Sequence, residues 1–280
     1  MTSTTTRPDP TLTTLQIGSV AARPKRWALS LVALIVPAVT ALLWEGGAAL
    51  GLISTRLIPA PSQIGATILK LAAEGELLGH VLTTTWRVVL GFFLGTLIAT
   101  LLGAATGVWP RFSRLFDPTL QALRSIPSIA WTPLFILWFG IFETSKVVLI
   151  AVGVFFPVYL ALAEAIGNVD RKLVEVGRVY GFTTMQLVRR ILLPASLPTY
   201  LIGLRAGLGL GWMFVVAAEF LGASRGLGYL LVDGQMTGRP AVILAAIVMF
   251  AVLGKLTDRL LASVGSRLVG WQDGFAAEAA

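Results

Sequence analysis

Few side chains in this 280-residue sequence are of the kinds that catalyse reactions or bind metals. It contains one histidine, His80, and no cysteine, which excludes disulfides, thiolate metal sites and iron–sulfur clusters. A single histidine is also a poor basis for a metal site or a membrane-embedded enzyme. No G-x4-G-K-[S/T] segment occurs, so the chain has no phosphate loop with which to cradle a nucleotide. We therefore expect this chain to bind no cofactor itself.

An acidic residue inside an apolar segment is the clearest candidate for a functional group. Glu219 lies near the end of such a segment, where a carboxylate is costly unless it is paired or faces water. Trp212 lies two helical turns earlier on nearly the same face, where its ring could form part of a gate. We name Trp212 and Glu219 as candidates for lining a translocation pathway. The alternatives are that Glu219 pairs with a cation such as Arg225 or reaches the membrane interface, and that Trp212 is an ordinary core residue.

The composition places these residues in a membrane protein. Hydrophobic residues make up 56% of the chain and charged residues 13%, with a mean hydropathy of +0.82. A soluble domain carries about 25% charged residues. The net charge of +8 could suggest nucleic acid as a partner. However, the cations form no basic stripe interleaved with aromatic residues, and their topology explains them, so we expect no nucleic acid partner.

Six apolar stretches are long enough to cross the bilayer as helices, which predicts an all-α integral membrane fold. They cover residues 27–50, 80–109, 115–140, 145–166, 199–222 and 240–261. The third contains Pro118, Pro127 and Pro133, and we expect it to be kinked or discontinuous. Glycines recur every fourth residue in three places, at 91 and 95, at 103 and 107, and from 203 to 211, and predict close helix packing within one subunit or between two.

The ends of the chain and its basic residues set the expected topology. Residues 1–26 are rich in Thr, Ser and Pro and are interpreted as a disordered cytoplasmic tail, with a signal peptide as the alternative. Residues 27–266 form the transmembrane domain and 267–280 a cytoplasmic tail. With both termini inside, 16 of the 22 Lys and Arg residues fall on the cytoplasmic side. That asymmetry supports the orientation.

The cytoplasmic loop 168–198 is too polar to span but keeps a helical period. Asp170 is a plausible N-cap for a first helix, and Gly181 stands where a glycine ends one. Thr183 and Gln186 form a T-x-x-Q capping box that starts a second helix, which we expect the prolines at 194 and 198 to stop. Such a basic hairpin suits docking to another protein, and an amphipathic hairpin lying on the membrane surface is the alternative.

The same loop resembles the E-A-A-x3-G-x9-I-x-L-P signature of permease subunits of bacterial ABC importers. The five fixed positions fall in register over 20 residues, on Glu175, Gly181, Ile191, Leu193 and Pro194. Val176 and Gly177 replace the two alanines. The resemblance extends from about 77 to 271, and segments such as SIPSIAWTPLFILWFGIFETSKVVLIAVG are similar to permeases for aliphatic sulfonates, taurine and nitrate.

That resemblance implies a type I ABC importer permease in the bacterial cytoplasmic membrane. It implies a homodimer, two cytoplasmic ATPase subunits that hydrolyse ATP, and an extracytoplasmic solute-binding protein that delivers a small anionic or zwitterionic solute, an aliphatic sulfonate in the first instance. Gly181 would then lie at the corner of the coupling helix. The residues that the resemblance assigns to ATPase coupling are Glu175, Gly177, Gly181, Ile191, Leu193 and Pro194.

The residues themselves leave a second class of function open, a stand-alone secondary transporter or channel. Such a protein needs its own coupling site near the midplane and often has a duplicated sequence pattern. We find no convincing internal repeat. A non-catalytic permease that depends on a partner ATPase is therefore our main prediction.

Overall fold

The structure is a computed structural model that describes residues 26–220 and 222–270, without the side chains of 26–34. The predicted amino-terminal tail falls outside the described residues except for Arg26, and the predicted carboxyl tail falls outside them from 271 onward. Every regular element within the described ranges is a helix, which confirms the all-α prediction.

The chain divides into two compact units, residues 1–53 and 54–280. The described part of the first unit is helix α1 (Arg26–Ala49) and a short turn. In that turn the backbone N–H groups of Leu50 and Leu52 donate to the carbonyls of Gly46 and Gly47 at 2.9 Å. Helix α1 lies where the first span is expected.

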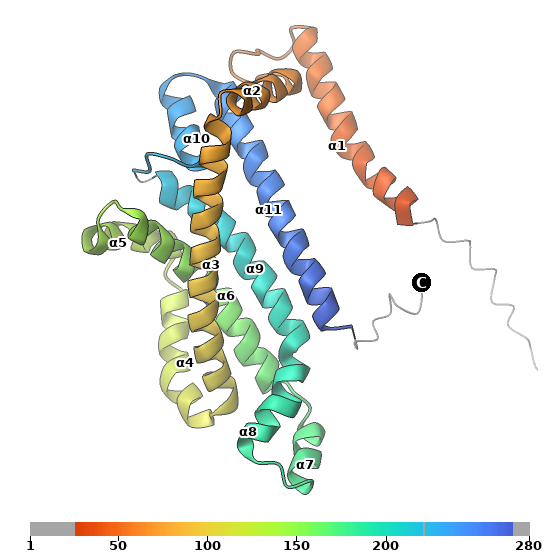
Figure 1. Cartoon of the computed structure of the whole chain (residues 1–280), viewed down its shortest axis with the longest axis vertical. Helices are drawn as coiled ribbons and strands as arrows, with labels where there is room; N and C mark the ends of the chain where they lie inside the picture. The colour runs from red at the N-terminus through yellow and green to blue at the C-terminus, as the bar shows by residue number, and fades with distance from the viewer. Residues whose placement is uncertain (1–25, 221, 271–280) are drawn as a thin grey trace, which may run out of the picture. The chain divides into compact units, whose positions relative to one another are not determined.

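The second unit is built around three long helices, α3, α6 and α9; a fourth long helix, α11, packs against α9, and shorter elements lie at the two ends (Figure 1). Its α-helices are α2 (Pro61–Ala73), α3 (Glu76–Val108), α4 (Pro110–Arg124), α5 (Thr132–Phe139), α6 (Glu143–Gly167), α7 (Arg171–Val179), α8 (Thr184–Leu187), α9 (Leu193–Phe220), α10 (Leu227–Met236) and α11 (Pro240–Leu268). A 3-10 turn, η1 (Ser128–Trp131), precedes α5, and a π-helical turn, η2 (Val188–Leu192), joins α8 to α9. We call the end of this unit that carries α2 and α10 the α10 end, and the opposite end, which carries α7 and α8, the α7 end (Figure 1).

Four helical stretches in the described ranges are long and apolar enough to cross a membrane: α3, α6, α11 and the continuous stretch Thr184–Phe220. The third predicted span is broken, because α4 and the segment Ser128–Phe139 meet at an angle of 89°. Pro127 stands at the N-cap of the new segment, which explains why the helix does not run straight through. The expected discontinuity is therefore confirmed.

Glycine ridges explain how α3 and α9 both pack closely on α6. A Cβ atom at Gly91 of α3 would lie 2.5 Å from Cγ2 of Ile150 on α6. One at Gly207 of α9 would lie 2.7 Å from Cγ2 of Val158, on another part of α6. The sequence left open whether these ridges serve one subunit or two, and the structure places both inside one chain.

A second apolar cluster joins α2, α10 and α11 at the α10 end. Leu71 of α2 is buried there with Leu227 and Leu230 of α10 and Ala246 of α11. The short helix between the first and second spans is therefore packed on the bundle, and it holds the α10 end together beside the charged residues described next.

Candidate functional site

The hairpin formed by residues 170–192 begins and turns as the sequence predicts. The Asp170 side chain accepts a hydrogen bond from the backbone N–H of Lys172 at 2.9 Å, which confirms the N-cap. Gly181 has a φ of +72°, and its N–H donates to the carbonyl of Arg178 at 2.9 Å. The next N–H, of Phe182, donates to Gly177 at 3.0 Å. This pair of bonds is the Schellman ending, in which the left-handed position favours glycine.

The capping box at the second helix is also confirmed. The backbone N–H of Thr183 donates to Oε1 of Gln186 at 2.9 Å, and the N–H of Gln186 donates to Oγ1 of Thr183 at 3.4 Å. The prediction that Pro194 and Pro198 stop this helix is wrong. The chain continues through the π-helical turn into α9, so that residues 184–220 form one helical stretch.

Pro194 is tolerated for local reasons, and Pro198 lies further along, inside α9. Pro194 lies in the first turn of α9, where a missing N–H costs little. Before it, the π-helical turn has already changed the hydrogen-bond register, since the N–H of Leu193 donates to the carbonyl of Val188. The hairpin is therefore joined to the membrane-spanning part of α9 without an intervening loop.

Gly177 holds the two arms of the hairpin together. It is buried, and a Cβ atom there would lie 2.5 Å from Cδ2 of Leu187 and 2.7 Å from Cδ1 of Ile191. The structure thus brings together Gly177 and Ile191, two of the residues assigned to coupling. Leu187 completes the contact, and its spacing of four residues from Ile191 on a helix was the signal that could have identified it.

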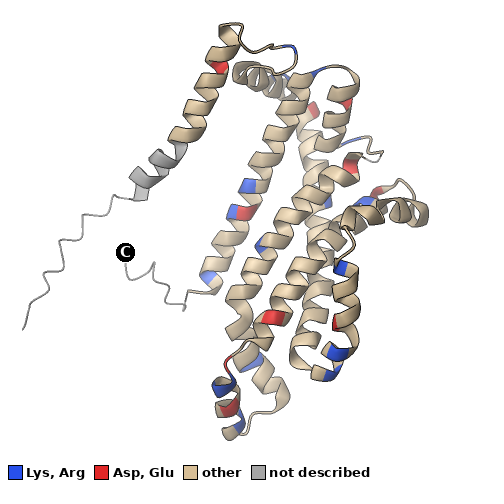
Figure 2. Cartoon of the chain, turned by 180° about the vertical axis from the view of Figure 1, so that it is seen from behind, with Lys and Arg blue, Asp and Glu red and all other residues tan. Residues whose placement is uncertain are grey.

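The other assigned residues lie at the surface of the hairpin. Glu175, Gly181, Leu193 and Pro194 are all exposed, and no atom comes within 4 Å of the Cβ position of Gly181. Four large apolar side chains of this arm are exposed as well: Leu173, Val176, Val179 and Tyr180. Lys and Arg residues and acidic residues surround them (Figure 2). An exposed apolar patch rimmed by charges is typical of a protein interaction site.

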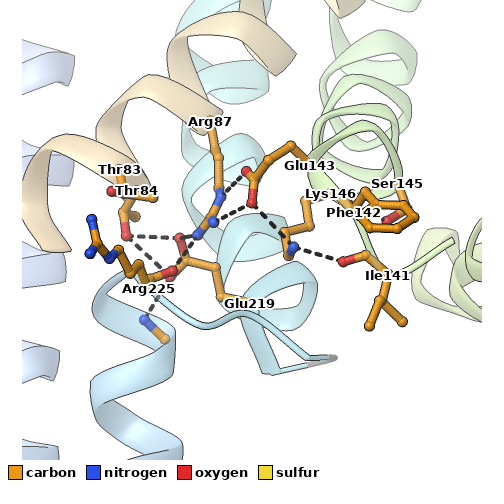
Figure 3. Close-up of polar contacts among 12 residues, drawn as sticks. Thr83, Thr84, Arg87, Ile141, Phe142, Glu143, Ser145, Lys146, Glu219 and Arg225 are labelled. Atoms are coloured by element: carbon orange, nitrogen blue, oxygen red, sulfur yellow. Dashed lines mark hydrogen bonds and ion pairs between the residues drawn. The ribbon is translucent and has the colours of Figure 1, made fainter. Parts of the chain in front are cut away.

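A cluster of four charged side chains, three of them buried, lies near the α10 end, between α3, α6 and α9 (Figure 3). The Arg87 side chain is 3% exposed and that of Glu219 is 0% exposed. Nη1 of Arg87 donates to Oε1 of Glu219 at 2.7 Å, while Nε and Nη2 each donate to a carboxylate oxygen of Glu143 at 2.6 Å. Lys146 adds a fourth charge, 3.3 Å from Glu143. Two cations and two anions therefore balance in one network.

The loop between α9 and α10 closes over this cluster. The backbone N–H of Gly228 donates to Oε2 of Glu219 at 2.7 Å, and Oγ1 of Thr84 donates to Oε1 at 2.8 Å. Arg87 donates from Nη1 to the carbonyl of Arg225 at 2.7 Å. A Cβ atom at Gly226, whose φ is +128°, would lie 2.5 Å from Oε1 of Glu219. The loop can lie this close only because glycine stands at 226.

The partner of Glu219 differs from the one the sequence suggested. Its cation is Arg87, from a different span, and Arg225 contributes its backbone carbonyl to the cluster. The signal was present, because Arg87 is also a charge within an apolar segment, and two such charges of opposite sign have reason to pair.

Trp212 lies in the core between α9 and α11. It is 7% exposed, its Nε1 donates to Oγ1 of Thr257 at 2.8 Å, and Phe250 packs edge-on with ring centroids 6.3 Å apart. In the present conformation both Trp212 and Glu219 are enclosed by protein. That they line the pathway stays a prediction.

Comparison with known proteins places this architecture in a family. A family model described as "Binding-protein-dependent transport system inner membrane component" matches residues 91–270, which include the hairpin, the broken span and the core helices. The chain belongs to this family. It is a membrane-spanning permease of an ABC importer, a component of the inner membrane.

Named relatives cover most of the permease. It is 41% identical to a protein named as an aliphatic sulfonates transport permease, SsuC of Bacillus subtilis, over 86% of this chain and 88% of that one. It is 33% identical to the taurine transport permease TauC of Escherichia coli, over 88% and 92%. Among solved structures, a chain of the MetNI methionine ABC transporter in an inward-facing conformation matches with a TM-score of 0.59 and 24% identity, over 69% of this chain and 94% of that one. This likeness shows the fold, that of a type I importer permease.

Proposed function

We propose that this permease carries aliphatic sulfonates into the cytoplasm as the membrane subunit of an ATP-driven importer. The observation that carries the proposal is the pattern of identities. Two proteins named as aliphatic sulfonates permeases are 41% and 36% identical to it, against 33% for a taurine permease and 32% for a nitrate permease. The same machinery working on taurine or nitrate is the alternative.

The proposed assembly has two copies of the permease, two ATPase subunits at the α7 end and a solute-binding protein at the α10 end. The α7 end and both termini lie in the cytoplasm in this arrangement. ATP is bound and hydrolysed by the partner, and this chain holds no cofactor. The exposed apolar residues of α7 and the corner at Gly181 supply the docking surface for the ATPase.

The α10 end has a polar hollow suited to contacts with a water-soluble protein. A cavity of about 600 Å3 lies between the start of α3, α10 and the following turn. Charges of both signs line it, among them Glu76, Arg225, Asp233 and Arg239. We assign contacts with the binding protein to this region.

The geometry supports a mechanical coupling between the two ends. Since residues 184–220 form one helical stretch, a tilt imposed on the hairpin is carried directly into α9. At the far end of α9, Glu219 is bound to Arg87 of α3 and to the loop that leads into α10. Closure of the ATPase would therefore favour one arrangement of the spans over another.

A substitution at the hairpin corner tests the docking assignment. Gly181→Val places a branched side chain at a φ of +72° on the proposed docking surface, and we expect it to reduce co-purification of the ATPase while the permease stays inserted. Gly238→Val is the matched control, because Gly238 has a φ of +64° and open space around it but lies at the α10 end. Equal ATPase recovery from the wild type and the Gly181 variant would refute the assignment.

A further inference from the structure

Helix α4 is an unusual arm of a membrane span, because it is polar and none of its residues is buried. It carries basic residues at both ends, Arg111 and Arg114 at the start and Arg124 at the finish (Figure 2). The 15 residues of α4 rise about 22 Å, roughly two thirds of the ~30 Å hydrocarbon core. Figure 1 shows α4 running back alongside α3. Because α4 and the segment Ser128–Phe139 together are long and apolar enough to form one broken span, Arg124 stands at the break within that span.

The charge of Arg124 is not neutralised by the described part of the chain. Its side chain is exposed and makes no hydrogen bond or ion pair within residues 26–220 and 222–270. Arg87 shows the contrast, since every charge in its buried cluster is paired. An arginine inside a span that faced lipid would be costly, so this face of α4 requires water or a counter-ion.

An apolar cavity lies directly beyond the break. Its volume is about 860 Å3, and η1 and α5 form one wall while α9 forms the other. Apart from Thr132, whose hydroxyl already donates to the carbonyl of Ile129, every lining side chain is apolar. Ile129, Met213 and Phe220 line it and are half or more exposed, so the cavity is open. Arg124 and Ile129 are separated by at most about 18 Å of chain.

We infer that the break in the third span is a substrate subsite of the pathway, in which Arg124 binds the anionic head of an alkanesulfonate and the apolar cavity receives its alkyl tail. This inference rests on the proposed function, and it names the residues that would bind the substrate and the kind of solute that they favour. Arginine forms strong, charge-assisted hydrogen bonds to anionic oxygens. Secondary transporters place substrate sites at discontinuous helices near the midplane, and the break in this span offers the same kind of geometry.

The same chemistry ranks the competing solutes. The amino group of taurine is charged, and the cavity wall offers it no acidic partner, so its burial there is unfavourable. Nitrate has no alkyl part with which to fill the apolar volume. An alkanesulfonate, which has an anionic head and an apolar tail, therefore matches the subsite better than taurine or nitrate.

Uptake by the complete importer in proteoliposomes, with its ATPase and binding protein, tests the subsite. We expect Arg124→Gln to lower uptake of labelled ethanesulfonate and butanesulfonate by about tenfold or more, and Arg124→Lys to restore part of it. Ala217→Leu, which narrows the cavity, should reduce uptake of butanesulfonate more than that of ethanesulfonate. Because the binding protein is the same in every assay, its own selectivity cancels. Arg111→Gln, on the same helix but at the α7 end, is the control and should leave uptake near wild type.

The outcomes separate the subsite from the proposed function. If the wild-type importer takes up no sulfonate, the proposed cargo is wrong and the subsite falls with it. If the wild type transports sulfonates and Arg124→Gln does so equally well, the subsite alone is overturned. Loss of ATPase co-purification in both the Gln and the Lys variants would show a purely structural role for Arg124 and would overturn it too.

The absence of native cysteine allows a direct test of what covers α4. Gln121 is exposed one turn before Arg124, so Gln121→Cys should react with the anionic reagent sulfonatoethyl methanethiosulfonate and be protected by ethanesulfonate. Adding Arg124→Gln should slow that reaction but not the reaction with the cationic analogue. Formation of a disulfide-linked dimer through Cys at 121 would show that a second copy covers this face, and failure to react would show that lipid does; either result contradicts the inference.

Discussion

The buried charge cluster makes a graded prediction about stability. In Arg87→Gln, Glu219 keeps its bonds from Thr84 and Gly228 but loses its ion pair with Arg87, and Glu143 loses both of its bonds from Arg87. Removing one partner of a buried ion pair costs about 3–5 kcal/mol. Because Arg87 and Glu219 are 3% and 0% exposed, solvent screening does not reduce this figure much.

Substitution of either carboxylate partner should lower the free energy of unfolding by less than Arg87→Gln does. Glu219→Gln keeps an oxygen for the N–H of Gly228 and leaves Arg87 paired with Glu143, so we expect a loss of about 1–3 kcal/mol. The side chain of Glu143 is 62% exposed, and Glu143→Gln should cost about 1 kcal/mol or less. The double variant Arg87→Gln/Glu219→Gln should be more stable than the sum of the single losses by about 0.5–3 kcal/mol.

The free energy of unfolding of all four variants is measured by equilibrium unfolding of the purified permease in mixed detergent micelles. The loss of helical circular dichroism reports the unfolding. The predicted order of loss is Arg87→Gln, then Glu219→Gln, then Glu143→Gln. If Glu143→Gln costs as much as Arg87→Gln, or if the two losses in the double variant simply add, the cluster is not the coupled, buried unit described above.

Three further predictions follow from the packing. Gly207→Leu should destabilise the permease by about 1–3 kcal/mol because it overpacks the contact with Val158. Gly209→Leu, on the same helix, has open space around it and should be nearly neutral. Equal melting temperatures for the two variants would contradict this prediction. Gly177→Val should reduce ATPase co-purification although Gly177 is buried, since it forces α7 away from Leu187, and unchanged recovery would show that the arms need no close contact. Trp212→Phe removes one hydrogen bond in the core, so it should lower the free energy of unfolding by about 0.5–1.5 kcal/mol and leave uptake near wild type. A large loss of uptake at unchanged stability would instead indicate that Trp212 is part of a gate.

The sequence predicts the hairpin well because its determinants are local. The N-cap at Asp170, the left-handed glycine at 181 and the capping box at Thr183 each act over two to five residues, so their spacing can be read directly. The same local reasoning failed at Pro194 and Pro198. A proline inside a helix removes one hydrogen bond and crowds the carbonyl four residues earlier, which can bend the helix without ending it. The π-helical turn ahead of Pro194 is not visible as a pattern in the sequence.

The charge cluster could not be predicted in the same way. Arg87 is 56 residues from Glu143 and 132 from Glu219, and no local pattern connects residues so far apart. Only the requirement that buried charges pair could have suggested it. The glycine ridges were visible, but their common partner α6 depends on how three helices meet, which spacing does not determine.

The role of this chain in an ATP-driven importer is tested by uptake of labelled ethanesulfonate into proteoliposomes that contain the permease, its ATPase and its binding protein. For a permease that is driven by a partner ATPase, we expect accumulation to require ATP and to fall in Gly181→Val together with recovery of the ATPase. Equal accumulation by the permease alone, without the ATPase subunits or ATP, would contradict this expectation and indicate a stand-alone transporter.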